Sequence, residues 1–266
     1  MSAPVPGVLE GGRLHPARPG GVARALAGAT GWCYRSAKRA GLTTRASRQD
    51  AAFDRRTVPQ QPPISVAGAG GRAPLRVLVL GNGLAESPGA GSFAEGFPNQ
   101  LARSLADRLH RRVEVKTLVG GAWDLQELDR RLREEQLHWH DVLVVTAAYR
   151  PMLAEVPLKG WSRYVESLRA TLVEAAGPEA VIRVLSLPWR TAAHDAPLEW
   201  GGLFGLRVRV VAEIAEAVLT ADQPALPLRL QPPLRSTEWR GPAFSPETYL
   251  RWADQVASDL ATTLPR

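Results

Sequence analysis

From residue 74 onward, short apolar runs alternate with longer segments in which apolar residues recur every three to four positions. Short apolar runs are typical of buried strands, and the longer spacing is typical of amphipathic helices. The runs predict strands at 75–80, 113–119, 141–148, 181–187 and 226–230. The intervening segments predict helices at 97–109, from about 124, and at 161–176, 203–219 and 246–264.

Strands that alternate with helices predict a parallel sheet with right-handed crossovers. Because the strands are almost continuously apolar, the sheet is expected to be covered on both faces. The pattern therefore predicts a three-layer α/β/α domain around a parallel sheet of about five strands. Ligands of such sheets bind at the carboxyl ends of the strands. That rule selects the loops at 81–92, 120–124, 146–152, 188–195 and 241–245.

The residues before this domain have a different composition. Residues 1–20 are rich in glycine and proline and are predicted to be disordered, and 57–73 has the composition of a linker. Between them, 21–41 favours a short basic helix, with Val22, Leu26, Ala29 and Cys33 at helical spacing. We therefore divide the chain into a basic, largely disordered segment at 1–73 and a domain at 74–266.

Two interpretations of the helix at 21–41 follow from its residues. It is either docked on the domain or a solvated arm, or it is an arm that binds an anionic partner such as membrane lipid or nucleic acid. Residues 1–73 hold 11 basic against 3 acidic residues, a balance of +8, whereas the rest of the chain has a balance of −1. The high isoelectric point therefore belongs to the N-terminal segment, and no nucleic-acid site is expected in the main domain.

Few other chemistries are indicated. Cys33 is the one cysteine, so neither an intramolecular disulfide nor a cysteine-based zinc site is expected. The histidines lack metal-ligand spacing, and we predict no metal and no cofactor. No apolar run has the length of a transmembrane helix. The chain opens Met1-Ser2-Ala3-Pro4 without the basic and apolar regions of a secretory signal, so a cytoplasmic location is expected.

Several segments, in chain order, resemble the sequence blocks of the SGNH/GDSL hydrolase family, whose members include esterases and lipases. VLVLGNGLAES at Val77–Ser87 is similar to the opening strand and Gly-Asp-Ser-Leu turn, and FPNQLARSL to the helix after it. LVGGAWDLQEL resembles the second block and DVLVVTAAYRP takes the place of the third. AFSPETYLRWADQVASDL resembles the last block, normally Asp-x-x-His-Pro. The resemblance covers about residues 75–264 and implies a flavodoxin-like fold and ester or carbohydrate-ester hydrolysis.

The family's chemistry requires a serine nucleophile, a histidine base and an aspartate that orients the histidine. Aligned residue by residue, Gly83 stands at the serine position and Asn82 at the block's aspartate. Ser245 stands at the histidine position and Pro242 at the orienting aspartate. From the residues themselves, Ser245 before a proline predicts a helix N-cap, and Gly81 and Gly83 predict a tight turn.

The family also stabilises the oxyanion with backbone N–H groups and an asparagine amide. Ala148 or Tyr149 stands at the asparagine position, so that amide is absent. Gly121, or its neighbour Gly120, is the one element of the oxyanion hole that is kept. Residual donors alone give about 10³–10⁴-fold acceleration over water. The aligned residues therefore predict a divergent member with degenerate blocks, a pseudoenzyme rather than a normal esterase.

A relocated triad is an alternative. Ser87 and Ser92 lie in the first of the selected loops, and His194-Asp195 lies in the loop after the fourth strand. Both loops are predicted at the same edge of the sheet, so either serine is a candidate nucleophile for His194. The competing interpretation is that all four are ordinary solvated loop residues.

A ligand pocket is also predicted at this edge. Glycine N–H groups together with arginines and aromatic rings suit a carboxylate or phosphate that has a flat or apolar part. The competing interpretation is that the aromatic rings fill the cleft and the arginines are solvated or paired. The predicted lining residues are Asn82, Gly83, Gly121, Trp123, Tyr149, Arg150, Trp189, Arg190 and Ser245.

Three functions are compatible with these residues. The first is an SGNH-like protein without normal esterase activity that binds a small anionic ligand. The second is an active ester hydrolase that uses Ser87 or Ser92 with His194. The third is a non-catalytic scaffold or regulator that acts through the basic N-terminal arm. A nucleotide site at Gly81-Asn-Gly83 is disfavoured because Glu86 replaces the third glycine of G-x-G-x-x-G.

Overall fold

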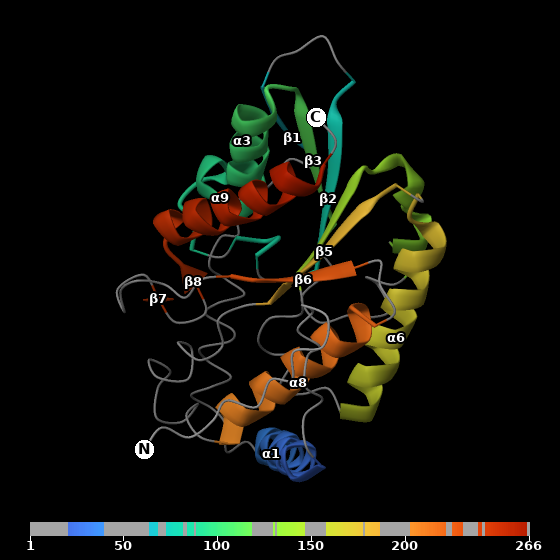
Figure 1. Ribbon diagram of the computed structural model, residues 1–266. Coiled ribbons are helices and arrows are strands. Elements are labelled where there is room, and N and C mark those ends of the chain that lie inside the picture. Colours follow the sequence, from blue (N-terminus) through green and yellow to red (C-terminus); the bar gives the residue numbers. More distant parts are fainter. Residues whose placement is uncertain are drawn as a thin grey trace, which may run out of the picture.

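A computed structural model describes most of the residues in the predicted domain and, before it, one helix and one short strand. These residues form a sheet with helices on both faces (Figure 1). The described residues are 21–39, 64–68, 73–81, 84–87, 89–118, 130, 132–146, 158–177, 179–186, 203–221, 225–230, 239–240 and 243–264.

The central sheet has six strands in the order β1-β3-β2-β4-β5-β6. All neighbours are parallel except β1, which pairs antiparallel with β3 at one edge. The five parallel strands have the strand order of a flavodoxin-like fold, which confirms the predicted α/β class. The strands are β1 (Ile64–Ala67), β2 (Leu75–Gly81), β3 (Val113–Leu118), β4 (Val142–Thr146), β5 (Val181–Ser186) and β6 (Ala225–Arg229).

Helices cover the sheet on both sides. Helices α3 (Phe97–Leu109) and α9 (Pro246–Thr263) pack together over one face, and α6 (Leu158–Ala175) and α8 (Leu203–Leu219) cover the other. Helix α1 (Gly21–Arg39) packs against α8 and lies outside it (Figure 1). The short elements are η1 (Phe93–Glu95), η2 (Leu137–Trp139) and the paired β7 (Trp239–Arg240) and β8 (Ala243–Phe244).

Alternate residues of each central strand enter two separate hydrophobic cores. Val77 and Val79 of β2 pack with α3 and α9, whereas Leu78 and Leu80 pack with α6 and α8. All four side chains are fully buried. A strand buried on both faces must be apolar at every position, which is why the sequence shows continuous runs rather than alternation.

Strand β1 corrects the interpretation of residues 57–73 as a linker. The tetrapeptide Ile64–Ala67 adds to the sheet edge, with Ile64 opposite Lys116 and Ala67 opposite Val113. Prolines and glycines on both sides dominate the composition of this region and hide the short β-forming stretch. Pairing satisfies backbone groups of β3 that would otherwise form an open edge.

His140, two residues before β4, is mostly buried beside a lysine–glutamate ion pair. Its side chain is 9% exposed, and its Nε2 lies 3.7 Å from Glu135 Oε1. Lys116 Nζ donates to both oxygens of Glu135, at 2.7 and 2.8 Å. Burial is the largest influence and lowers the pKa of His140 below 6.5, although Glu135 acts in the opposite direction.

This lowered pKa makes stability depend on pH. Below pH 6.5 the unfolded chain takes up a proton that the folded protein resists, so the free energy of unfolding should fall as pH falls toward the folded pKa. His140→Gln removes the group that titrates, so we expect the free energy of unfolding of this variant to depend less on pH. The measurement is urea unfolding of both proteins across mildly acidic pH. Identical pH profiles would contradict the proposed role of His140.

Candidate functional site

The last residue of β2 is a glycine whose conformation and surroundings leave no room for a side chain. Gly81 pairs with Thr146 of β4 and has a φ of +124°, which side-chain-bearing residues rarely adopt. A Cβ at this position would overlap the carbonyl oxygen and Oγ1 of Thr146. Thr146 Oγ1 itself donates a hydrogen bond to Leu80 O at 3.1 Å. Gly81 therefore has a backbone conformation and a close contact that favour glycine, at the carboxyl edge of the sheet, and the rest of the predicted turn, with Gly83, lies outside the described residues.

The hydroxyl of Ser87 has a structural role in the loop that follows. Ser87 is fully buried and has a φ of +54°. Its Oγ accepts a hydrogen bond from Phe97 N at 2.8 Å and donates one to Leu84 O at 3.0 Å. The oxygen thus satisfies the first N–H of α3, which has no partner within the helix. A buried hydroxyl engaged in this way argues against Ser87 as the nucleophile of a relocated triad.

Loss of the Ser87 hydroxyl is expected to reduce stability. Ser87→Ala leaves the buried Phe97 N–H without an acceptor, which should lower the free energy of unfolding by about 1–3 kcal/mol. Ser92→Ala is the matched control, because Ser92 is exposed and its side chain makes no cap hydrogen bond. Chemical denaturation should place Ser92→Ala within about 0.5 kcal/mol of wild type. Equal stability of the two variants would refute the structural role of Ser87.

Ser245 is the N-cap of α9, as predicted. It is 5% exposed, has an extended backbone, and accepts a hydrogen bond on Oγ from Thr248 N at 3.4 Å. Pro246 follows at the first helical position, where its missing N–H costs nothing. Helix α9 contacts η1, and Tyr249 in its first turn shares a core with Leu84, so the loop after β2 and the beginning of the last helix lie on the same side of the sheet.

An aromatic cluster that the sequence interpretation missed fixes this helix start. Phe244 packs edge to face on Tyr249 and on Trp252, with ring centroids 6.0 and 4.6 Å apart. All three side chains belong to the core that also contains Leu84 and Ala85 of the first loop. Tyr249 and Trp252 are three residues apart, which is the spacing of one face of a helix, and Phe244 lies just before that helix. This spacing indicates that the rings are buried, but it does not show which residues they pack against.

Most of the other predicted site residues lie outside the described residues, so their convergence stays a prediction. The structure does describe the strand ends that precede these residues in the sequence, which are Gly81 of β2, Leu118 of β3, Thr146 of β4 and Ser186 of β5. These strands are neighbours in the sheet. The residues outside the described parts are Asn82, Gly83, Gly120, Gly121, Trp123, Ala148, Tyr149, Arg150, Trp189, Arg190, His194, Asp195 and Pro242.

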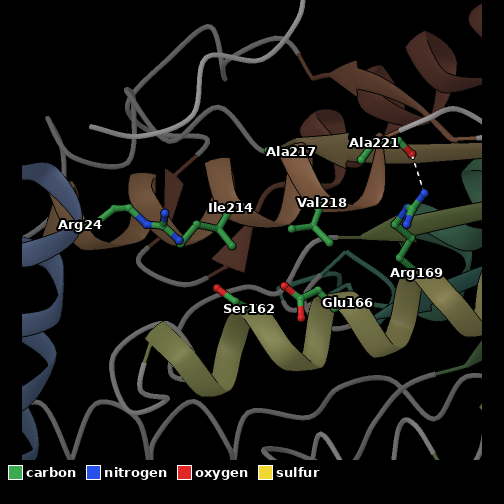
Figure 2. A pocket seen from close by; sticks show the side chains of 8 residues that line it. All are labelled: Arg24, Ser162, Glu166, Arg169, Ile214, Ala217, Val218 and Ala221. Carbon is green, nitrogen blue, oxygen red and sulfur yellow. Dashed lines mark hydrogen bonds between the residues drawn. The ribbon is translucent and has the colours of Figure 1, made fainter. Parts of the chain in front are cut away.

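A surface groove lies elsewhere, between α6 and α8 and next to α1 (Figure 2). Its volume is about 360 Å³, and Arg169 Nη2 donates to Ala221 O at 3.0 Å across one end. The predicted site residues that the structure describes, Ser87, Ser92 and Ser245, do not line it. The lining residues are Arg24, Ser162, Glu166, Arg169, Ile214, Ala217, Val218 and Ala221.

The described part of the chain contains neither a cluster of metal ligands nor a membrane-spanning helix. Among those residues, no three His, Cys, Asp or Glu side chains gather closely enough to hold a metal ion. Within the same residues, every helix is too short or too polar to cross a bilayer.

Comparisons with known proteins return distant structural likenesses. The salicylyl-acyltransferase SsfX3 from a tetracycline biosynthetic pathway aligns with a TM-score of 0.49 and 12% identity, over 73% of this chain and 57% of its own. The acetyl xylan esterase Est2A from the rumen bacterium Butyrivibrio proteoclasticus aligns with a TM-score of 0.43 and 11% identity, over 74% and 65%. This chain therefore spans less than two thirds of either neighbour.

No protein-family model and no curated protein matches the sequence. At such low identity a structural likeness concerns the fold and transfers no activity. The fold class accordingly rests on the strand order and the two helix layers of this protein itself.

Proposed function

We propose that residues 74–266 form an SGNH/GDSL hydrolase-like domain without normal esterase activity, which binds a small anionic ligand at the carboxyl ends of its strands. The observation that carries this proposal is Ser245. It stands where the family resemblance expects the catalytic imidazole, and its buried Oγ accepts from Thr248 N at the start of α9. A hydroxyl in that position cannot take a proton from a nucleophile near neutral pH.

The position of the nucleophile supports the same proposal. Gly83 has no side chain to attack an acyl carbon. The nearby Ser87 hydroxyl is engaged by Phe97 N and Leu84 O. Without both the base and the nucleophile, only substrate positioning and backbone hydrogen-bond donors remain. These accelerate hydrolysis far less than an intact triad does.

The ligand class follows from side chains that lie three to five residues after the strand ends. Arg150 follows β4 and Arg190 follows β5, and these strands are neighbours in the sheet. Trp123, Tyr149 and Trp189 occupy comparable positions after β3, β4 and β5. Guanidinium groups beside aromatic rings suit a carboxylate with a flat ring.

Benzoate is a suitable probe for this proposal, with acetate as the anion that lacks a ring. A ligand that binds only the native state raises the melting temperature, by an amount that grows with its concentration relative to Kd. We expect benzoate to raise Tm more than acetate does, and Arg150→Ala or Arg190→Ala to abolish the rise. Arg112→Ala is the control, because Arg112 pairs with Glu114 at the other end of β3. The proposed site would be refuted if benzoate did not raise the melting temperature of wild type, or if the rise were lost in all three variants, including the Arg112→Ala control.

A second function is favoured by one observation. Ser92 is exposed and makes no cap hydrogen bond at the start of η1, so its hydroxyl is accessible in the first loop. An ester hydrolase that uses Ser92 with His194 would need an accessible hydroxyl of this kind. A hydrolysis assay of Ser92→Ala and His194→Ala separates this alternative from the main proposal.

A further inference from the structure

In its first ten residues, 21–30, helix α1 presents its larger apolar side chains to solvent. Val22 is 76% and Leu26 is 44% exposed, whereas Ala27 is fully buried against the neighbouring helix layer. Ala25 and Ala29 are also exposed, so residues 22, 25, 26 and 29 form an apolar stripe on the outer side of the helix. Within residues 21–30, the docked side is thus formed by small residues such as Ala23 and Ala27.

A buried arginine holds α1 in this orientation. Arg207 of α8 is 1% exposed, and its Nη1 donates to Ala27 O at 2.7 Å. A buried guanidinium is costly unless its donors are satisfied, so the contact with Ala27 O opposes rotation of α1 about its axis. The apolar stripe is therefore a defined surface of the folded protein, located outside α8 (Figure 1).

The charge of α1 indicates what covers the stripe. Residues 21–39 contain Arg24, Arg35, Lys38 and Arg39 and no acidic residue. A helix with an apolar stripe and only basic charges has the composition of helices that lie in the interface of anionic membranes. We propose that the outer face of α1 docks the folded protein on a membrane surface that contains anionic lipids.

Other occupants fit this face less well. Nucleic acid would engage the basic side chains but offers no apolar surface to Val22 and Leu26. A second copy would bring two basic helices together and be opposed by like-charge repulsion. An anionic lipid surface supplies both an acyl region for the stripe and headgroups for the bases.

Vesicle flotation of the full chain tests the proposal. The vesicles are phosphatidylcholine alone and phosphatidylcholine mixed with phosphatidylglycerol, at low and high ionic strength. We expect binding to the anionic vesicles about tenfold tighter or more than to the neutral ones, and weaker at high salt. Val22→Glu with Leu26→Glu should reduce binding to the anionic vesicles by about tenfold or more.

The matched control is Val173→Glu with Leu250→Glu, which alters two other apolar side chains that are 47% and 49% exposed. It should bind vesicles like wild type, and circular dichroism should show that all three proteins are equally folded. Equal loss in both double variants, or no preference for anionic vesicles, would overturn the proposal. So would duplex DNA binding in place of vesicle binding, or a dimer that dissociates in the Val22→Glu, Leu26→Glu variant.

Discussion

Replacement of Gly81 by alanine is expected to lower the free energy of unfolding by roughly 3–5 kcal/mol, or to prevent folding. Two costs combine at this position. The φ of +124° is strained for any residue with a Cβ, and that Cβ would overlap the backbone oxygen of Thr146. Because the overlap involves backbone of the adjacent strand, it cannot be relieved by a side-chain rotation.

Gly28→Ala provides the control for this prediction. Its added Cβ would meet only Leu158 Cδ1, at an ordinary 3.9 Å, and Gly28 lies within α1. Alanine is the better helix former by about 1 kcal/mol, so this variant should be as stable as wild type or more stable. Chemical denaturation measures both variants. A Gly81→Ala protein that is as stable as Gly28→Ala would show that the backbone at Gly81 differs from the one described.

Removal of the Asp259 carboxylate should destabilise the protein by about 3 kcal/mol. Arg183 lies in the middle of β5 and is 4% exposed, and its Nε donates to Asp259 Oδ2 of α9 at 2.5 Å. Nη2 of the same arginine donates to Thr263 Oγ1 at 2.6 Å. Asp259→Ala would leave a buried guanidinium without its counter-ion.

Asp254→Ala is the matched control on the same helix. Asp254 pairs with Arg108 of α3, but both side chains are substantially exposed, at 54% and 37%. Exposed ion pairs contribute about 0–1 kcal/mol, so this variant should be near wild type. Thermal and urea unfolding of the two variants compare them directly. Similar losses in both would contradict the special role of the Arg183–Asp259 pair.

The secondary structure of the main domain was predictable because strands buried on both faces of the sheet appear in the sequence as continuous apolar runs. The helix predicted at 97–109 is α3 (Phe97–Leu109), and the predicted strand at 181–187 is β5 (Val181–Ser186). Arg183 shows where the pattern stops being informative. The run VIRVLS predicts a strand, but nothing local indicates that its arginine is neutralised by a carboxylate from the last helix.

The N-terminal helix shows a second limit. Periodicity indicates that Val22 and Leu26 share a face, but not whether that face meets the domain or solvent. The answer depends on Arg207, which is distant in the sequence and donates to Ala27 O. Docking of α1 on α8 agrees with one of the two interpretations of the sequence, and the outward direction of its apolar stripe was not foreseen.

The candidate site was only partly accessible to prediction. Ser245 as an N-cap and Gly81 as a turn residue follow from short-range rules on capping and backbone conformation. The role of Ser87 did not follow, because its partner Phe97 N belongs to a helix that begins ten residues later. A serine whose hydrogen-bond partner is distant in the sequence cannot be distinguished, from the sequence alone, from a solvated loop serine.

Hydrolysis of p-nitrophenyl acetate and butyrate tests the central claim most directly. The assay compares wild type with Ser87→Ala, Ser92→Ala and His194→Ala, each checked for native folding. We predict that wild type hydrolyses both esters no faster than the three variants, because the aligned positions lack a nucleophile and a base. Turnover by wild type that collapses in Ser92→Ala or His194→Ala would contradict this account and identify a working hydrolase.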